Sequence, residues 1–163
     1  MVTSTDLLLP TLAELMVEQG LMLATAESCT GGLIAGACTE LSGSSAWFER
    51  GFVCYSNDAK IELLGVDPAH IVAYGAVSQV VARAMAVGAV ARSRAQVSVA
   101  VTGVAGPTGG SPEKPVGTVW FGWQVHGMLH SEQRLFDGDR SAIRASTVQH
   151  AVQKLVTLLQ DRR

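Results

Sequence analysis

Apolar residues recur at helical spacing in some segments of the chain and form strand-like runs in others. Because the two kinds of segment alternate, the chain is predicted to alternate between helices and strands. Four residues at helical spacing indicate a first amphipathic helix, Leu8, Leu12, Leu15 and Met16. Gly20 follows them as the expected C-cap. An apolar strand is predicted over residues 21–25 and a helix of small residues over 33–41, and together they form the first βα unit.

The same pattern continues to the end of the chain. It predicts a strand over 47–55, helices over 56–64 and 75–92, strands over 97–102, 116–125 and 128–136, and a last helix after residue 140. In the 75–92 helix we expect the apolar face at Val80, Ala84, Val87 and Ala91. Asp67 and Pro68 are expected in a loop, and Gly127 in a hairpin turn.

This order of elements predicts an α/β fold, a single three-layer α/β/α domain over residues 1–163 with a mixed, largely parallel sheet. The antiparallel strands should lie toward one edge. In such sheets the loops at the carboxyl ends of the strands form the site. The turns at Ser28, Tyr55 and Thr102 all follow predicted strands, so they converge if those strands are parallel.

Composition excludes several classes of partner. The net charge of −2, without a cluster of basic residues, argues against nucleic acid. No apolar run approaches the ~20 residues of a membrane span and no signal pattern begins the chain, so we expect a cytoplasmic protein with no membrane partner. The cysteines Cys29, Cys38 and Cys54 have no metal-ligand spacing, which predicts no metal site, and Cys38 and Cys54 should lie in the core.

Ser28 lies in the turn between the first strand and the helix of small residues. A turn through Gly31 and Gly32 leaves the first N–H groups of that helix unpaired, where they favour a phosphate, a carboxylate or a developing oxyanion. The alternative is structural: Thr30 caps the helix and the two glycines serve close packing.

A serine nucleophile needs a base, and none of the four histidines accompanies a glycine-rich loop. Tyr55 and Lys60 flank the second strand-to-helix turn and are better candidates. A lysine withdrawn from water loses preference for its charged form, so it could accept the proton of Ser28 directly or through the Tyr55 hydroxyl. The alternatives are a solvated Lys60 and a core aromatic at Tyr55. Cys29, adjacent to Ser28, is expected to serve packing.

Two further segments could bind an anionic or polar ligand. The loop after Thr102 supplies backbone donors, unless it is only an ordered surface loop. Arg140 and Arg144 lie four residues apart on one helix face, where they could grip a phosphate or stand as surface charges. No Gly-Lys-Ser or Gly-Lys-Thr occurs, which argues against hydrolysis of ATP or GTP.

Six motifs occur in an order that closely resembles the CinA C-terminal-domain family, over residues 7–159. They are Ala26-Glu27-Ser28-Cys29-Thr30-Gly31-Gly32, Tyr55-Ser56-Asn57-Asp58-Ala59-Lys60, Gly75-Ala76-Val77-Ser78, Thr102-Gly103-Val104-Ala105-Gly106-Pro107, Lys114-Pro115-Val116-Gly117-Thr118-Val119 and Gly138-Asp139-Arg140. The chain resembles the stand-alone form, without the family's separate N-terminal domain. Gln79 and Asp58 depart from the family pattern, which commonly has glutamate at both positions.

The resemblance implies an α/β/α domain, often a homo-oligomer, that hydrolyses the carboxamide of nicotinamide mononucleotide without metal or cofactor. It implies Ser28 as nucleophile and Tyr55 with Lys60 as the proton-handling pair. It also implies a set of substrate-binding residues, with Arg140 at the phosphate: Thr30, Gly31, Gly32, Thr102, Gly103, Gly106 and Arg140.

A second hypothesis is a non-catalytic sensor that binds a phosphorylated nucleotide in a competence or DNA-damage response. Such a sensor would use the helix termini and arginines but would not need Tyr55 with Lys60. The two hypotheses differ in one observable, whether Ser28 and Lys60 come within hydrogen-bond range.

Overall fold

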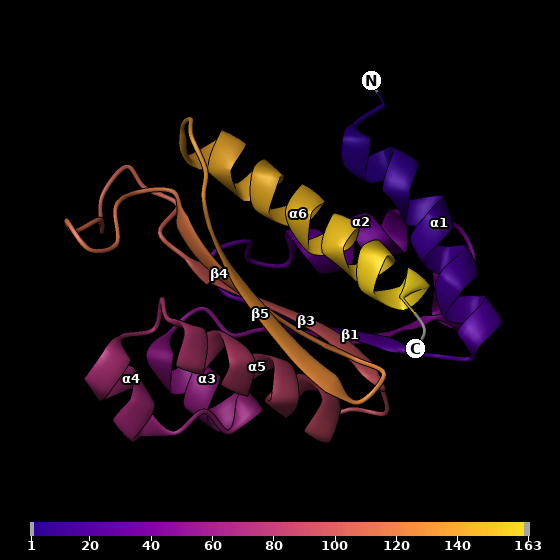
Figure 1. Cartoon of the computed structure of the whole chain (residues 1–163), viewed down its shortest axis with the longest axis horizontal. Helices are drawn as coiled ribbons and strands as arrows, with labels where there is room; N and C mark the ends of the chain where they lie inside the picture. Colours follow the sequence, from indigo (N-terminus) through magenta and orange to yellow (C-terminus); the bar gives the residue numbers. More distant parts are fainter. Residues whose placement is uncertain (1, 162–163) are drawn as a thin grey trace.

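The computed structural model describes residues 2–161, in which five strands form one sheet between two layers of helices (Figure 1). Helices α1, α2 and α6 cover one face of the sheet, and α3, α4 and α5 cover the other. The elements in chain order are α1 (Ser4–Gln19), β1 (Leu23–Glu27), α2 (Leu33–Glu40), β2 (Phe48–Val53), α3 (Asn57–Leu64), α4 (Pro68–Tyr74), α5 (Gln79–Ala91), β3 (Val97–Gly103), β4 (Thr118–Val125), β5 (Met128–Leu135) and α6 (Arg140–Gln160). The predicted three-layer α/β/α architecture is confirmed, while residues 1, 162 and 163 of the predicted domain lie outside the described part.

The sheet order is β2-β1-β3-β4-β5, with β2, β1 and β3 parallel and both β3–β4 and β4–β5 antiparallel. The last residue of β1, Glu27, pairs with Val53 of β2 and Val101 of β3. The carboxyl ends of the three parallel strands therefore meet at one edge of the sheet. The predicted convergence of the turns after these strands is confirmed.

Short-range capping explains where several helices begin and end. Gly20 ends α1 in the left-handed conformation, as predicted. Ser56 caps α3 by accepting a hydrogen bond from the Ala59 N–H, and Ser78 caps α5 through the Val81 N–H. The hairpin turn between β4 and β5 places His126 and Gly127 at positive φ, 52° and 74°, which matches a two-residue type I′ turn.

Three local predictions were wrong. The first strand begins at Leu23 rather than at Leu21. Asp67 and Pro68 do not form a loop but start α4, with Asp67 as N-cap and proline in the first turn, where its missing N–H costs nothing. The predicted face of α5 is wrong, because Val80 and Ala84 are half-buried and Val87 and Ala91 are exposed. The buried residues of this helix are Val81, Ala82, Met85, Ala86, Gly88 and Ala89.

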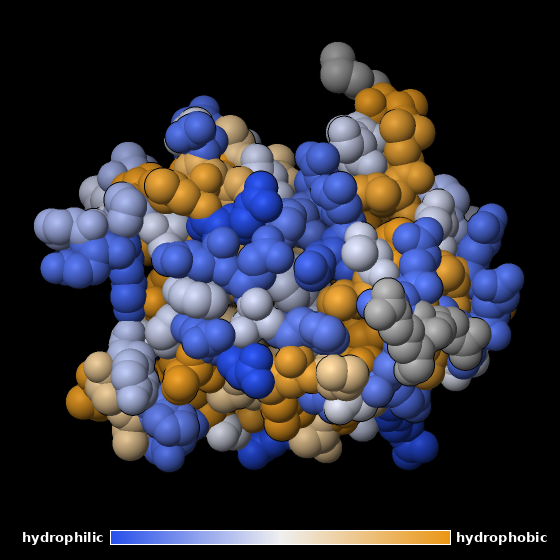
Figure 2. Space-filling view, viewed as in Figure 1, coloured by the Kyte–Doolittle hydropathy of each residue, from blue (hydrophilic) through white to orange (hydrophobic). Residues whose placement is uncertain are grey.

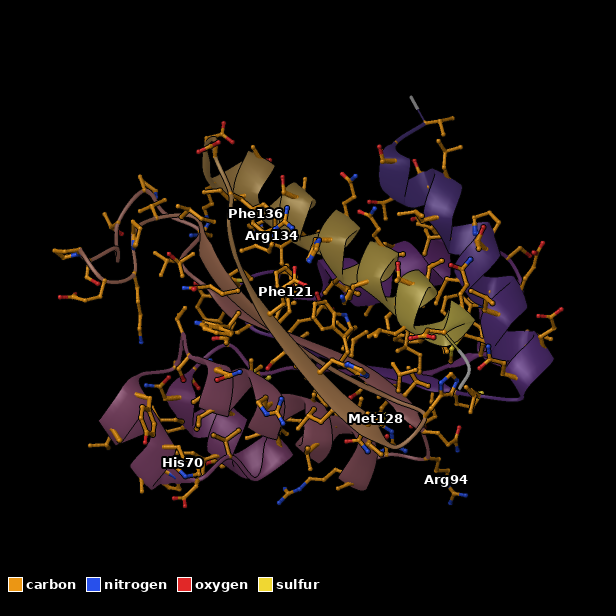
Figure 3. All side chains as sticks on the ribbon, viewed as in Figure 1. His70, Arg94, Phe121, Met128, Arg134 and Phe136 are labelled. Carbon is orange, nitrogen blue, oxygen red and sulfur yellow. The ribbon has the colours of Figure 1, made fainter. Side chains whose placement is uncertain are left out.

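Each face of the sheet has its own core. On the face of α6, Phe121 packs against Trp123 with stacked rings and against Phe136 edge to face, with ring centroids 5.2 and 6.2 Å apart (Figure 3). Cys38 and Cys54 are fully buried, as predicted. The two cores fix the strands that carry the site from both sides.

Polar residues gather across the middle of the face on which α6 and β5 lie, with apolar residues around them (Figure 2). There Glu132 of β5 accepts from His150 of α6 at 2.7 Å. Over residues 2–161, none of the helices combines the length and apolar character that crossing a membrane requires.

Candidate active site

A cavity of about 240 Å³ opens at the carboxyl edge of the parallel strands. The turns after β1, β2 and β3 contribute to its wall, together with the segment before α5 and the start of α6. Its lining residues are Ser28, Cys29, Tyr55, Asn57, Lys60, Ala76, Val77, Thr102, Gly103, Ala105 and Arg140. Sequence-distant motifs therefore meet in one cavity.

Ser28 and Lys60 are in direct contact within this cavity. The Lys60 Nζ lies 2.9 Å from the Ser28 Oγ and 3.0 Å from the Tyr55 carbonyl oxygen. The Ser28 hydroxyl in turn lies 3.3 Å from the same carbonyl. The pair is thus within the range in which a base accepts a proton from a nucleophile.

Lys60 is almost completely buried, with 2% of its surface exposed, so the solvated alternative is wrong. It lies on the first turn of α3, which begins after the cap at Ser56. Burial lowers the pKa of the Lys60 amine from its usual 10.5, and among the described residues no carboxylate forms an ion pair with it. Burial thus shifts the amine toward its neutral form, which is the form that can act as a base.

Tyr55 meets the pair through its backbone rather than through its phenol. Its carbonyl oxygen accepts from both Lys60 and Ser28, while the residue is 62% exposed. The alternative of a core aromatic is therefore wrong. Of the two routes for the serine proton, the geometry favours direct transfer between Ser28 and Lys60.

The Ser28 turn is fixed by two charged residues. The buried Glu27 carboxylate accepts from the Ile34 and Ala35 N–H groups at 2.8 and 3.0 Å, the role that a capping side chain plays. The predicted cap at Thr30 is therefore wrong: the cap position is Gly32, and the Thr30 hydroxyl donates to Glu27. Arg144 of α6 donates to the carbonyls of Cys29 and Thr30, both at 3.1 Å.

Cys29 contributes its backbone to the cavity. Burial raises the pKa of its thiol to about 12, which keeps the thiol protonated and unreactive at neutral pH. Within the described part of the chain, the Cys29 and Ala105 N–H groups donate no hydrogen bond to another residue. Both residues line the cavity, so these donors can face a bound ligand.

The opposite wall is held by two further hydrogen bonds. The Thr102 hydroxyl donates to the Ala76 carbonyl at 2.9 Å, which fixes the segment before α5. Arg140 donates to the Gly106 carbonyl at 2.8 Å. A second cavity, of about 640 Å³, shares Ala105 and Arg140 with the first and extends along the start of α6. A ligand longer than the first cavity can therefore continue past Arg140.

Six of the ten predicted site residues line the cavity, namely Ser28, Tyr55, Lys60, Thr102, Gly103 and Arg140. The other four do not: Thr30, Gly31, Gly32 and Gly106. Gly31 and Gly32 shape the turn at positive φ, 57° and 107°, where other residues are strained. Arg144, a candidate for gripping an anion, holds the turn instead.

Sequence reasoning did not single out Asn57, Ala76, Val77 and Ala105, although each belongs to a motif quoted for the family resemblance. Their membership in those motifs was the signal in the sequence that could have identified them as cavity residues. Gln79, one of the two departures from the family pattern, lies outside the lining and donates to Ser131 of β5. Across the described residues 2–161, no three His, Cys, Asp or Glu side chains gather as metal ligands would.

The fold and the site together define a class, an α/β/α domain with a serine and a buried lysine paired at the carboxyl edge of its sheet. The model of the CinA C-terminal domain matches residues 6–159. The chain belongs to this family, as its motifs predicted.

Relatives support this over nearly the whole chain. The nicotinamide-nucleotide amidohydrolase PncC of Enterobacter agglomerans is 52% identical over 158 residues, covering 92% of this chain and 94% of that one. The protein of the same name from Pseudomonas putida is 57% identical over 134 residues, 82% and 84% of the two chains. The crystal structure of the competence/damage inducible protein CihA from Agrobacterium tumefaciens superposes with a TM-score of 0.92 at 48% identity, covering 96% of each chain.

Proposed function

We propose that this chain hydrolyses the carboxamide of nicotinamide mononucleotide to nicotinate mononucleotide and ammonia, with Ser28 as the nucleophile. One observation carries the proposal: the Ser28 Oγ lies 2.9 Å from a buried lysine amine. Relatives about half identical to this chain bear the name nicotinamide-nucleotide amidohydrolase, and this supports the choice of substrate.

In the first step, the neutral Lys60 amine takes the Ser28 proton while the serine oxygen attacks the carboxamide carbon. The C–N bond then breaks, and the Lys60 ammonium gives its proton to the departing nitrogen. Ammonia leaves, and the acyl group stays on Ser28 as an ester. The Tyr55 carbonyl supports both states of Lys60, because it accepts from an amine and from an ammonium alike.

In the second step, water hydrolyses the ester between the acyl group and Ser28. Lys60 takes a proton from the water as its oxygen attacks the acyl carbon. Collapse of this intermediate breaks the bond to Ser28, whose oxygen recovers the proton from Lys60. The acid product gives its remaining proton to solvent and leaves as a carboxylate, and the pair returns to its starting state.

The oxyanion of each intermediate needs preorganised donors, and the Cys29 and Ala105 N–H groups are suited to this role. Arg140 is suited to the substrate phosphate, because one of its nitrogens holds Gly106 and its remaining N–H groups are able to bind an anion. Thr102 and Gly103 would line the pyridine and ribose.

The proposal is tested by ammonia release from nicotinamide mononucleotide. We expect Ser28→Ala to lower kcat/KM by about 10⁴-fold or more while the thermal unfolding midpoint stays near that of the wild type. Ser45→Ala, an exposed serine outside the cavity, is the matched control and should keep full activity. Undiminished turnover in Ser28→Ala would refute the assignment. Thermal stabilisation by the nucleotide without any product, in the wild type, would favour the sensor.

A further inference from the structure

The Glu27 carboxylate lies immediately before Ser28 and is completely buried. Its Oε1 accepts from the Thr30 hydroxyl and the Ile34 N–H, and its Oε2 accepts from the Ala35 N–H, at 2.5, 2.8 and 3.0 Å. No described cation forms an ion pair with it. Its charge is therefore satisfied by donors of the nucleophile turn and of α2.

The same turn is held from outside by Arg144. This side chain reaches the turn from α6 and donates to the carbonyls of two consecutive residues, Cys29 and Thr30. It lies so close that a Cβ at Gly31 would come within 3.4 Å of its Nη2. The Cys29 N–H donates to none of the residues that the structure describes, and Cys29 lines the cavity.

We infer that Glu27 is a positioning residue for the reaction, and that it acts with Arg144 to hold Ser28 and the Cys29 N–H at a fixed distance from the substrate carbonyl. The inference rests on the proposed function and adds two residues: Glu27, which lines neither cavity, and Arg144, which lines the second cavity and holds the turn through its guanidinium. A displacement of about 1 Å in such a group can cost about 10²-fold in rate.

The chemistry of the site suggests an informative substitution. Three donors converge on the two carboxylate oxygens, and Glu27→Gln keeps the shape but replaces one oxygen with an NH₂ group. At least one buried donor then faces another donor, so the turn must shift. Thr30→Val is a milder change, since it removes one donor and leaves the bonds to Ile34 and Ala35.

The experiment measures kcat and KM for nicotinamide mononucleotide well below the unfolding temperature of each variant. We expect Glu27→Gln to lower kcat about 10²-fold with KM changed less than about threefold, since Glu27 lines neither cavity. Arg144→Met should lower kcat about tenfold. Thr30→Val should lower kcat a fewfold. Thr39→Val, which removes an exposed hydroxyl from the same helix away from the turn, should leave kcat unchanged.

A second readout does not depend on the substrate. Phenylmethanesulfonyl fluoride labels an activated serine: the oxygen bonds to sulfur, the S–F bond breaks, fluoride leaves and the proton passes to Lys60. Mass spectrometry of the Ser28 peptide gives the labelling rate, which should fall in Glu27→Gln and Arg144→Met in parallel with kcat. Glu27 is not among the groups that move the pKa of Lys60, so the pH dependence of kcat should keep its midpoint and lose only height.

The outcomes separate this inference from the proposed function. If the wild type neither releases ammonia nor is labelled at Ser28, both the proposed function and the positioning role of Glu27 are refuted. An active wild type whose folded variants keep wild-type kcat and labelling would overturn the positioning role alone, as would a shifted pH midpoint, which indicates an electrostatic role. If Glu27→Gln does not fold, Thr30→Val and Arg144→Met decide in the same way.

Discussion

The turn between β1 and α2 and the turn between β2 and α3 each deliver a reactive group to one cavity, but they are held by different means. The second turn is capped locally, by Ser56 through the Ala59 N–H three residues on. The first has a bare glycine at its cap position and depends on Glu27, six residues before the start of α2, and on Arg144, more than a hundred residues away. The proposed base thus lies at a helix start that is capped by its own neighbours, and the proposed nucleophile lies on a turn held by residues farther along the chain.

This difference suits the two roles. Lys60 needs burial, which a regular helix packed on the sheet provides. In the proposed mechanism, Ser28 needs a neighbouring N–H group that stays unpaired. Glu27 accepts from the Ile34 and Ala35 N–H groups, which a side chain at the cap position would otherwise hold, and the Cys29 N–H donates to none of the described residues.

The largest effect should come from removing the base. We expect Lys60→Met to lower kcat/KM by about 10³-fold, because proton transfer to a positioned base contributes about 10²–10⁴-fold. Ammonia release measures this. Lys154→Met, on α6 outside the cavity, is the control. Near-normal turnover in Lys60→Met would show that Lys60 is not the base for Ser28, and the contrast between a turn that carries the base and a turn that carries the nucleophile would no longer hold.

The same substitution should stabilise the protein. The pKa of Lys60 is lowered in the folded state, so the wild type gains stability as pH rises from that lowered value to 10.5 and loses it as pH falls. At neutral pH, Lys60→Met removes this burial cost and should raise the free energy of unfolding by about 1 kcal/mol. Urea unfolding at several pH values should show the gain shrinking toward pH 10.5; a gain that grows with pH would contradict the cause given.

The smallest effect should come from the local cap. Ser56→Ala removes one hydrogen bond to the start of α3 and should cost about 1 kcal/mol of stability, a fall of about 2–4 °C in the unfolding midpoint. Because the backbone bond from the Lys60 N–H to the Ser56 carbonyl remains, kcat should change less than in Glu27→Gln. An equal loss of kcat in Ser56→Ala and Glu27→Gln would contradict the contrast, because the two turns would then depend on their capping side chains to the same extent.

The same contrast explains what the sequence could predict. The convergence of Ser28, Tyr55 and Lys60 followed from strands whose carboxyl ends share one edge, and Gly20 and Ser56 act on neighbouring residues. The contacts of Glu27 depend on how the turn folds back onto α2, and those of Arg144 depend on where α6 packs, so no residue spacing predicted either of them.

The wrong prediction for the face of α5 has a related cause. A run in which nearly every residue is apolar, such as Val80, Val81 and Ala82, offers several possible faces. Packing against the sheet selects among them: Gly122 of β4 lies against the Ala82 backbone so closely that a Cβ there would come within 2.5 Å of the Ala82 oxygen. The buried face of α5 is therefore determined by its packing against β4 and not by the sequence of the helix itself.

The central claim, that Lys60 is the base for Ser28, is tested most directly by titrating its side chain. The chain has only three lysines, Lys60, Lys114 and Lys154, so the ¹³Cε resonance of Lys60 in ¹³C-lysine protein can be assigned by its loss in Lys60→Met. We predict a midpoint below 10.5 that coincides with the pKa on the rising limb of kcat/KM against pH. A midpoint at or above 10.5, or a rate that rises at a different pH, would contradict the account.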